Sequence, residues 1–245
     1  MLRREREREL LESLKQSEIA NVVTKGLNPN VPMKDSGIPW IGMIPEHWIP
    51  CRNKDIFVES KKTVGENSSE YVLLSLTKQG VIIRDLSENK GKFPKEFNTY
   101  KIVEPEDIIF CLFDVDETPR TVGLSHNYGM ITGAYDVFKI KDVNPKFILY
   151  YYLSIDDRKA LRPLYKGLRK VVPLPIFMSS KIFLPPLSEQ QAIVEYIDSK
   201  LSKIDQYMAD LQAEIDYLKE FKQRLISDAV TGQICVAEPQ KGDTQ

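Results

Sequence analysis

The sequence predicts an α+β fold, in which a mixed α/β globular domain is joined to a short N-terminal helix and a long C-terminal helix. Three observations predict it. The first 25 residues have helical character, strand-like apolar stretches lie between residues 50 and 180, and apolar side chains recur at helical spacing after Pro186. The 245 residues are 42% hydrophobic and 28% charged, which suits a modest core with a large exposed surface and excludes wholesale disorder.

Residues 2–24 predict the N-terminal helix, because alternating arginines and glutamates are followed by apolar side chains at helical spacing. Gly26 and the turn residues 28–32 end it. The glycine- and proline-rich segment that follows contains Trp40 and Trp48. We interpret this segment as an ordered connector whose tryptophans pack onto the middle domain.

The middle domain contains strand-like stretches rich in β-branched and aromatic residues. They lie at Tyr71–Leu76, Val81–Arg84, Ile108–Phe113 and Ala134–Ile140. An apolar and aromatic run begins at Phe147 and predicts a helix that continues to about Arg162. Several prolines then interrupt the chain before the last helix.

The last helix is predicted from Ser188, which with Gln191 fits a capping box, to about Thr231. Its apolar residues are separated by alternating steps of three and four, as in a heptad seam. The seam consists of Val194, Ile197, Leu201, Ile204, Met208, Leu211, Ile215 and Leu218. Such a helix is about 66 Å long at 1.5 Å per residue. We expect its seam to form a dimer or subunit interface by antiparallel coiled-coil or bundle packing; an ordinary core helix is the alternative.

The N-terminal helix repeats the C-terminal end of the long helix. Residues 11–27 align without a gap with residues 218–234 and share six identities, where about one is expected by chance. The identical pairs are Leu11/Leu218, Lys15/Lys222, Gln16/Gln223, Ile19/Ile226, Val23/Val230 and Thr24/Thr231. Such a repeat allows one copy to continue head-to-tail into another, or two copies to close a pseudo-symmetric ring.

Charge is distributed unevenly along the chain. The 34 basic and 35 acidic residues give a net charge of −1, so the total gives no sign of a nucleic-acid-binding protein. From Arg158 to Lys170, however, six residues are basic and none is acidic, whereas residues 181–245 contain 7 basic and 11 acidic side chains. The neutral total therefore combines a basic stretch in the middle domain with an acidic C-terminal helix.

Three widely spaced cysteines, Cys51, Cys111 and Cys235, and two histidines indicate neither a disulfide framework nor a metal site. The longest apolar run, Ile108–Phe113, is far shorter than the roughly 20 residues of a membrane-spanning helix. The N-terminus is rich in arginine and glutamate and lacks the apolar core of a signal peptide. We therefore expect a soluble, cytoplasmic protein with no membrane contact.

Four segments together resemble the specificity subunits of type I restriction-modification systems. In chain order they are Val22–Leu27, Val31–Gly37 with Ile44–Trp48, Leu184–Val194, and Leu218–Ile226 with Ala229–Gly232. The third resembles the start of the helix typical of these subunits, and the fourth resembles its end. The resemblance covers nearly the whole chain, and the segments occur in the order of the family.

The resemblance implies two target-recognition domains held apart by two antiparallel helices, each domain reading half of an interrupted DNA site. This chain contains one such domain and resembles a half-length form. The implied parts are an N-terminal helix and connector (1–45), a target-recognition domain (46–184), a long coiled-coil helix (185–235) and a disordered tail (236–245). Two copies are then expected to form a homodimer on inverted half-sites.

The resemblance also implies a non-catalytic chain. Methyltransferase subunits would bind its long helix and carry S-adenosylmethionine, and a motor-nuclease subunit, contacted indirectly, would carry ATP. No cofactor is expected in this chain, and its sequence contains no glycine-rich phosphate-binding loop.

Recognition of double-stranded DNA requires cations aimed at phosphates and a few side chains at base edges. The first candidates form one basic loop, in which glycine permits close approach of the backbone: Lys166, Gly167, Arg169 and Lys170. Further candidates are Lys90, Lys92, Lys95, Lys61 and Lys62, with Arg120 and His126 as weaker base-reading residues. The alternative for such cations, and the favoured one for Arg158, Lys159 and Arg162, is a solvated helix face.

Two other functions fit parts of the sequence. Residues 108–118 resemble the motif of haloacid-dehalogenase-type phosphatases, in which Asp114 would be the nucleophile and Asp116 the acid/base beside magnesium. However, strand-like segments precede this motif and Pro119 follows it where a helix should begin, which favours a capped loop. A coiled-coil adaptor without a DNA role explains the long helix but not the aromatic-rich middle domain.

Overall fold

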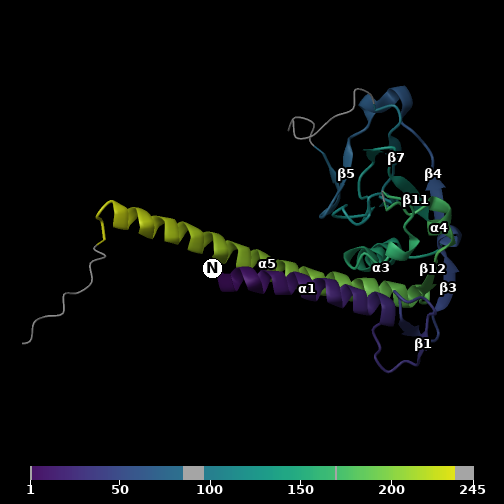
Figure 1. Cartoon of the computed structure of the whole chain (residues 1–245), viewed down its shortest axis with the longest axis horizontal. Coiled ribbons are helices and arrows are strands. Elements are labelled where there is room, and N and C mark those ends of the chain that lie inside the picture. The colour runs from purple at the N-terminus through teal and green to yellow at the C-terminus, as the bar shows by residue number, and fades with distance from the viewer. Residues whose placement is uncertain (1, 85–96, 169, 235–245) are drawn as a thin grey trace, which may run out of the picture. The chain divides into compact units, whose positions relative to one another are not determined.

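The computed structural model describes residues 2–84, 97–168 and 170–234. These residues form two compact units, one from 1–15 with 199–245 and one from 16–198, called unit 1 and unit 2 below (Figure 1). The expected tail, 236–245, and Cys235 lie outside the described residues. None of the helices in the described part is long and apolar enough to cross a membrane.

The helices are α1 (Leu2–Lys25), α2 (Asn53–Ile56), α3 (Pro145–Asp157), α4 (Leu174–Ser179) and α5 (Leu187–Val230), with 3-10 turns η1 (Gly65–Glu70) and η2 (Arg162–Leu164). The strands are β1 (Met33–Asp35), β2 (Met43–Pro45), β3 (Ile49–Arg52), β4 (Phe57–Ser60), β5 (Leu74–Thr77), β6 (Gly80–Ile83), β7 (Lys101–Val103), β8 (Ile108–Phe110), β9 (Val122–Leu124), β10 (Gly129–Ile131), β11 (Asp136–Ile140) and β12 (Lys181–Leu184).

All strands within the described residues lie in unit 2 and pair antiparallel. A four-stranded sheet has the order β4-β11-β8-β9, and the two-stranded pairs are β1–β2, β3–β12, β5–β6 and β7–β10. The β3–β12 pair places Ile49 opposite Leu184. The start and the end of the middle domain are therefore hydrogen-bonded to each other, just before α5 begins.

Strand β8 is buried on both faces because successive side chains point to opposite sides of the sheet. Phe110 joins an aromatic cluster in which its ring centroid lies 4.9 Å from that of Tyr152 and 4.8 Å from that of Phe177. Ile109 belongs to a separate aliphatic cluster with Leu74, Val81, Val103, Ile131 and Val137. This double burial explains why β8 reads as a continuous apolar run in the sequence.

Helix α3 begins and ends by local chemistry. The Asn144 side chain accepts hydrogen bonds from the backbone N–H groups of Lys146 and Phe147, at 2.9 and 3.1 Å, and Pro145 occupies the first helical position. The helix ends at Asp157, and Lys159 has a left-handed φ of 48°. The prediction of a helix to about Arg162 therefore ran too far, since the backbone reverses first.

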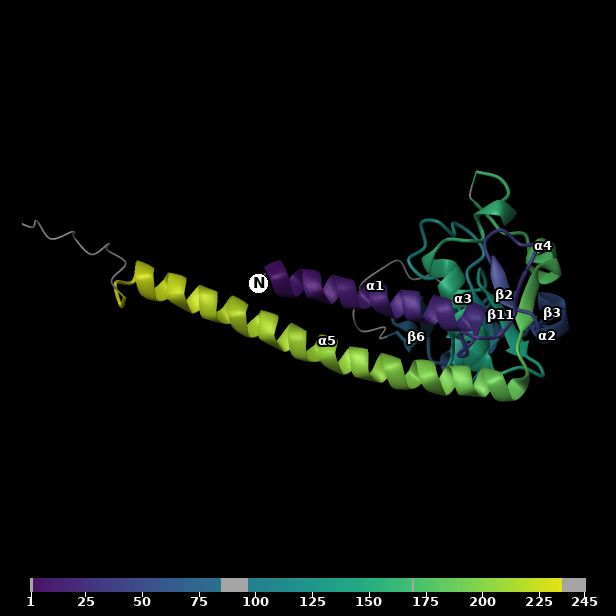
Figure 2. The same ribbon diagram turned by 90° about the horizontal axis from the view of Figure 1, so that it is seen from below.

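Helix α1 runs antiparallel to α5 (Figures 1 and 2). In unit 1, Lys15 pairs with Asp205 at 2.7 Å and Arg4 pairs with Glu214 at 3.0 Å. In unit 2, Tyr196 donates to Glu18 at 2.5 Å. Residue numbers along α1 therefore increase as the residue numbers of their partners along α5 decrease, as in an antiparallel pair of helices. The predicted α+β class, with a mixed domain and two helices that pack together, is confirmed.

Two local predictions need correction. The capping box does not form, because α5 begins at Leu187, before Ser188, and the Gln191 amide instead accepts from Asn144 and donates to Glu195. The strand predicted at Ile108–Phe113 ends at Phe110, since the following residues enter a turn around Asp114.

We predict that Tyr152→Phe lowers the free energy of unfolding by about 1–3 kcal/mol, because it leaves the side-chain oxygen of a buried asparagine unpaired. The Tyr152 hydroxyl donates to Asn53 Oδ1 at 2.5 Å, and Asn53 is fully buried. Tyr151→Phe is the matched control, because the Tyr151 hydroxyl is buried without a hydrogen-bond partner among the described residues. Urea denaturation should show no loss for it, and equal losses for the two variants would contradict this account.

Candidate nucleic-acid interface

The sequence motifs meet at the first turns of α5, within unit 2. The Trp48 indole N–H donates to Glu189 Oε1 at 3.3 Å, and His47 Nε2 lies 2.8 Å from Glu189 Oε2. Gly26 ends α1 with a φ of 74°, and a Cβ there would approach the Glu189 carboxylate to 2.9 Å. The turn after α1, the tryptophan connector and the start of α5 are therefore joined through one carboxylate.

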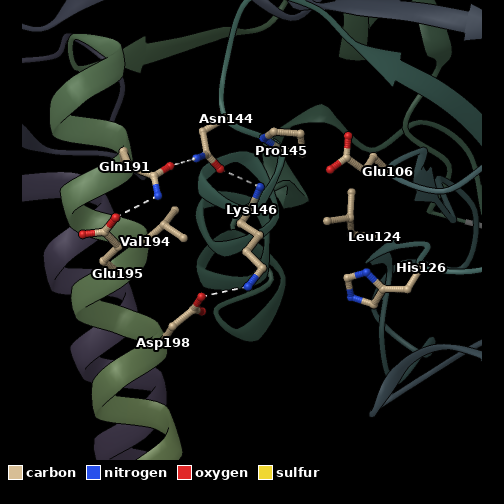
Figure 3. A pocket seen from close by; sticks show the side chains of 10 residues that line it. All are labelled: Glu106, Leu124, His126, Asn144, Pro145, Lys146, Gln191, Val194, Glu195 and Asp198. Carbon is tan, nitrogen blue, oxygen red and sulfur yellow. Dashed lines mark hydrogen bonds and ion pairs between the residues drawn. The ribbon is translucent and has the colours of Figure 1, made fainter.

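A second set of polar contacts joins α3 to α5. Buried Gln190 accepts a hydrogen bond from the Asn144 backbone N–H and donates to the Pro185 carbonyl, each at 2.9 Å. Lys146 pairs with Asp198 at 2.8 Å. Asn144, Lys146 and Asp198 border a groove of about 320 Å³ whose opposite wall carries Glu106, Leu124 and His126 (Figure 3). His126, one of the weaker base-reading candidates, thus faces α3 and α5.

The first DNA-binding candidates lie on a hairpin that follows η2. Lys166 and Val171 exchange backbone hydrogen bonds of 2.8 and 3.2 Å, which closes the loop between them. Gly167 has a φ of 68° and no atom within 4 Å of a Cβ placed there, so the tip is open. Lys166 is exposed, and the Leu168 side chain is fully exposed (102%). Arg169 lies outside the described residues.

Asp116 holds the base of this hairpin. Its Oδ1 accepts from Arg162 Nε at 3.0 Å and from the Tyr165 hydroxyl at 3.2 Å, and its Oδ2 lies 3.2 Å from Lys170 Nζ. Its hydrogen bond with Arg162 lowers the pKa of Asp116 from the usual value. Two cations of the basic stretch, Arg162 and Lys170, therefore share one carboxylate while their side chains stay 65% and 41% exposed, a pairing that the sequence analysis did not predict.

The aspartate motif itself forms a turn. Asp114 has a left-handed φ of 46°, and its backbone carbonyl accepts from the N–H groups of Glu117 and Thr118 at 3.0 and 2.9 Å. Asp116 is occupied by the hairpin cations. This geometry agrees with the capped loop rather than with the strand-to-helix arrangement that the phosphatase alternative requires. No cluster of three metal-ligating side chains occurs within the described ranges.

Arg120 is built into the fold. Its guanidinium pairs with Asp157 at 2.8 Å and with Asp156 at 3.4 Å, and its side chain is 16% exposed. Asp156 is almost fully buried and also accepts from the Thr121 N–H and from Lys159. These contacts tie the loop before β9 to the end of α3, so they give Arg120 a role within unit 2 whether or not it contacts DNA.

The other predicted cations are more exposed. Lys61 pairs with Glu59 at 3.3 Å and Lys62 with Glu104 at 3.5 Å, with lysine side chains 80% and 67% exposed. Such pairs are weak and leave these lysines available to a phosphate. Lys90, Lys92 and Lys95 lie outside the described residues. For all these positions, contact with DNA stays a prediction.

The seam of α5 is largely covered within the chain. Val194 and Ile197 are buried in unit 2, and Leu211 and Ile215 are buried in unit 1. Leu201, Ile204, Met208 and Leu218 are partly exposed. The apolar surface of α5 that stays open lies mostly at and beyond the end of the seam, at Tyr217, Phe221, Leu225, Ile226 and Val230.

Cys51 and Cys111 are free thiols in the described part of the chain. Burial raises the pKa of both, and Cys111 is the more deeply buried. A raised pKa leaves little of the nucleophilic thiolate at neutral pH. Cys111 therefore contributes to the packing of the core.

A sequence model of the family described as "Type I restriction modification DNA specificity domain" matches residues 45–217. The match covers well over half of the 245 residues, so the chain belongs to this family. The resemblance seen in the sequence is confirmed, as is the prediction of a non-catalytic specificity component.

Individual relatives agree with this assignment. The Type I restriction enzyme MjaVIII specificity subunit of Methanocaldococcus jannaschii is 26% identical over 250 residues, which cover 93% of this chain and 55% of that protein. The Type I restriction enzyme StySPI specificity subunit of Salmonella potsdam is 27% identical over 145 residues, which cover 55% of this chain and 30% of that protein. The chain spans about half or less of the length of these relatives.

Solved structures show the likeness of fold. The HsdS subunit from Thermoanaerobacter tengcongensis matches with a TM-score of 0.51 at 18% identity, over 94% of this chain and 53% of that one. A chain described as "Structural basis underlying complex assembly and conformational transition of the type I R-M system" matches with a TM-score of 0.58 at 16% identity, over 92% and 53%.

We predict that Arg120→Ala lowers the free energy of unfolding by about 1–3 kcal/mol, because it removes a charged hydrogen-bond partner from buried Asp156. Lys166→Ala is the comparison, and it should change stability by less than about 0.5 kcal/mol since Lys166 is exposed at a loop tip. Chemical denaturation of the full chain measures both. If Lys166→Ala proved as destabilising as Arg120→Ala, this division into internal and external cations would be wrong.

Proposed function

We propose that this chain recognises DNA for a type I restriction-modification assembly, that unit 2 reads one half of a bipartite site, and that α5 binds methyltransferase subunits. In this proposal the chemistry belongs to the partners: methyltransferase subunits with S-adenosylmethionine and, indirectly, a motor-nuclease subunit with ATP. The observation that carries the proposal is the exposed basic hairpin 165–171 within a domain of the DNA specificity family.

The hairpin suits phosphate contact. Lys166 is exposed, and no carboxylate in the described residues pairs with it. Lys170, although paired with Asp116, still exposes 41% of its side chain. A loop held at its base and open at its tip can bring cations and backbone to a DNA groove. Contacts to phosphates would fix the register, and contacts to base edges would supply the sequence information.

A selection experiment tests the proposal. The full chain, assembled with the matching methyltransferase subunits, is incubated with a random duplex library, and the bound DNA is sequenced. We expect enrichment of a bipartite sequence with a fixed spacer. Assembly without any enriched sequence would favour the adaptor without a DNA role.

We predict that Lys166→Ala weakens binding of the assembly to the selected duplex and lowers the slope of log K against log salt by about 0.9, the value for one lost phosphate contact. Arg169→Ala should act similarly. Lys54→Ala is the control, because this exposed lysine on α2 is outside the predicted set. Unchanged affinity and slope for both hairpin variants would place the DNA contact elsewhere.

The proposal extends to a homodimer through the open end of α5. Ile226 and Val230 repeat Ile19 and Val23 of α1 in the sequence. The α1 residues are 6% and 0% exposed, whereas Ile226 and Val230 are 47% and 82% exposed. Since the same side chains are buried in one copy of the repeat and open in the other, a second chain is the partner that fits this face best. Two-fold symmetry then makes the half-sites inverted repeats.

We predict that light scattering gives the mass of two chains, free or on DNA, and that the double variant Ile226→Lys with Val230→Lys gives the mass of one. Charges on an apolar interface oppose its burial. Gln223→Lys adds a charge to the same exposed part of α5 and should leave the dimer intact. A wild-type monomer both in solution and on DNA would exclude the dimer, and loss of methyltransferase binding without loss of the dimer would assign this face to that subunit.

A further inference from the structure

The function proposed above assigns no role to Asp116, yet this carboxylate contacts three side chains at the base of the hairpin. Three donors from one short stretch converge on it: Arg162, Tyr165 and Lys170. Its side chain is only 19% exposed, whereas its neighbour Glu117 is 78% exposed and contacts Lys170 only at 3.8 Å. One carboxylate therefore fixes η2 and both sides of the hairpin base, and the next one along the chain does not.

The tip presents an apolar side chain to solvent. Leu168 is fully exposed, and the backbone that carries it is set by the hydrogen-bonded pair Lys166–Val171 and by the left-handed φ of Gly167. The Val172 N–H further donates to the Leu112 carbonyl at 2.8 Å, which attaches the hairpin to the segment after β8.

We propose that Asp116 is a positioning residue for DNA recognition and that the hairpin it holds places Leu168 in a DNA groove. The inference rests on the proposed DNA-binding function. An apolar side chain flanked by cations suits a groove, where it contacts a thymine methyl group or wedges against a base step while lysines meet the neighbouring phosphates. A protein surface as the partner of Leu168 is the competing outcome.

The two interpretations of Asp116 predict opposite changes in DNA affinity when its charge is removed. If Asp116 were only a negative charge near DNA, neutralising it would tighten binding, because a phosphate would be repelled less. If it positions the hairpin, neutralising it weakens binding, because Arg162 and Lys170 lose the charge that holds them and an NH2 group, which cannot accept, replaces one of the two acceptor oxygens. Glu117→Gln removes the same charge from the adjacent residue and leaves the three contacts of Asp116 in place, so it reports the electrostatic effect alone.

We predict that Asp116→Asn, in the assembly with methyltransferase subunits, weakens binding to the selected duplex about tenfold and lowers the salt slope, whereas Glu117→Gln leaves binding unchanged or slightly tighter. In a background of Lys166→Ala with Leu168→Ala, Asp116→Asn should add little, because residues that act through one element are not additive. Tighter binding of Asp116→Asn, or full additivity in that background, would overturn the positioning role.

A measurement without DNA separates this inference from the proposed function. Hydrogen exchange of the free full chain should show faster exchange of the Lys166 and Val171 amides in Asp116→Asn, with α3 and the β8 sheet unchanged. Unchanged exchange at these amides refutes the anchoring role, even if the chain binds DNA. Local loosening in a chain that selects no DNA would instead refute the recognition function.

The role of Leu168 has its own test. Leu168→Ala should weaken binding to the selected duplex about tenfold, within the range for loss of one good base contact, and leave the salt slope unchanged because no cation is lost. It should bind an unrelated duplex as the wild type does. Weaker binding of methyltransferase subunits with unchanged affinity for DNA would assign Leu168 to a protein contact and overturn the groove contact.

Discussion

The apolar seam of α5 is the feature on which the rest of the structure depends. A helix of 44 residues with a continuous apolar stripe is not stable alone in water, so other parts of the chain must cover the stripe. Within unit 2, Val194 and Ile197 are buried, and within unit 1, Leu211 and Ile215 are buried, with α1 antiparallel to α5 in each unit. Beyond Leu218 several apolar side chains of α5 stay exposed, and the proposed second chain would cover them.

The same helix explains the residues that mark the family. Glu189 accepts from Trp48, and Gln190 accepts from the Asn144 backbone while donating to Pro185. Each of these polar side chains near the start of α5 therefore bonds to a different part of unit 2. Buried polar groups are expensive unless they are paired, so these partners restrict the arrangement of the domain on the first turns of α5. A recognition domain needs such a fixed base if its loops are to meet DNA in one register.

The long elements could be predicted from the sequence because their signals are local. Helical periodicity identified α1 and α5, and a run of consecutive apolar residues identified β8. Three-residue strands such as β1, β7 and β10 carry no such pattern and depend on pairing with distant residues. The capping box failed for a related reason: Gln191 had the right spacing, but Asn144, 47 residues away, is its partner.

The candidate site, too, could be predicted only in part from the sequence. Charge along the chain identified the stretch from Arg158 to Lys170, but it did not show which cations face solvent. The fold decides that: Arg162 and Lys170 pair with Asp116 yet stay 65% and 41% exposed, whereas Lys159, which pairs with Asp156, is 20% exposed. The repeat between α1 and α5 could also be read from the sequence, whereas only the opposite exposure of its two copies points to the surface of the proposed dimer.

The central claim is that two copies of this chain read two inverted half-sites. Hydroxyl-radical footprinting of the selected duplex, bound to the assembly with methyltransferase subunits, tests it most directly. The account predicts two protected stretches of inverted sequence, equal in strength and related by a two-fold axis, with a less protected spacer between them. A single protected stretch, or two stretches of unrelated sequence, would contradict it.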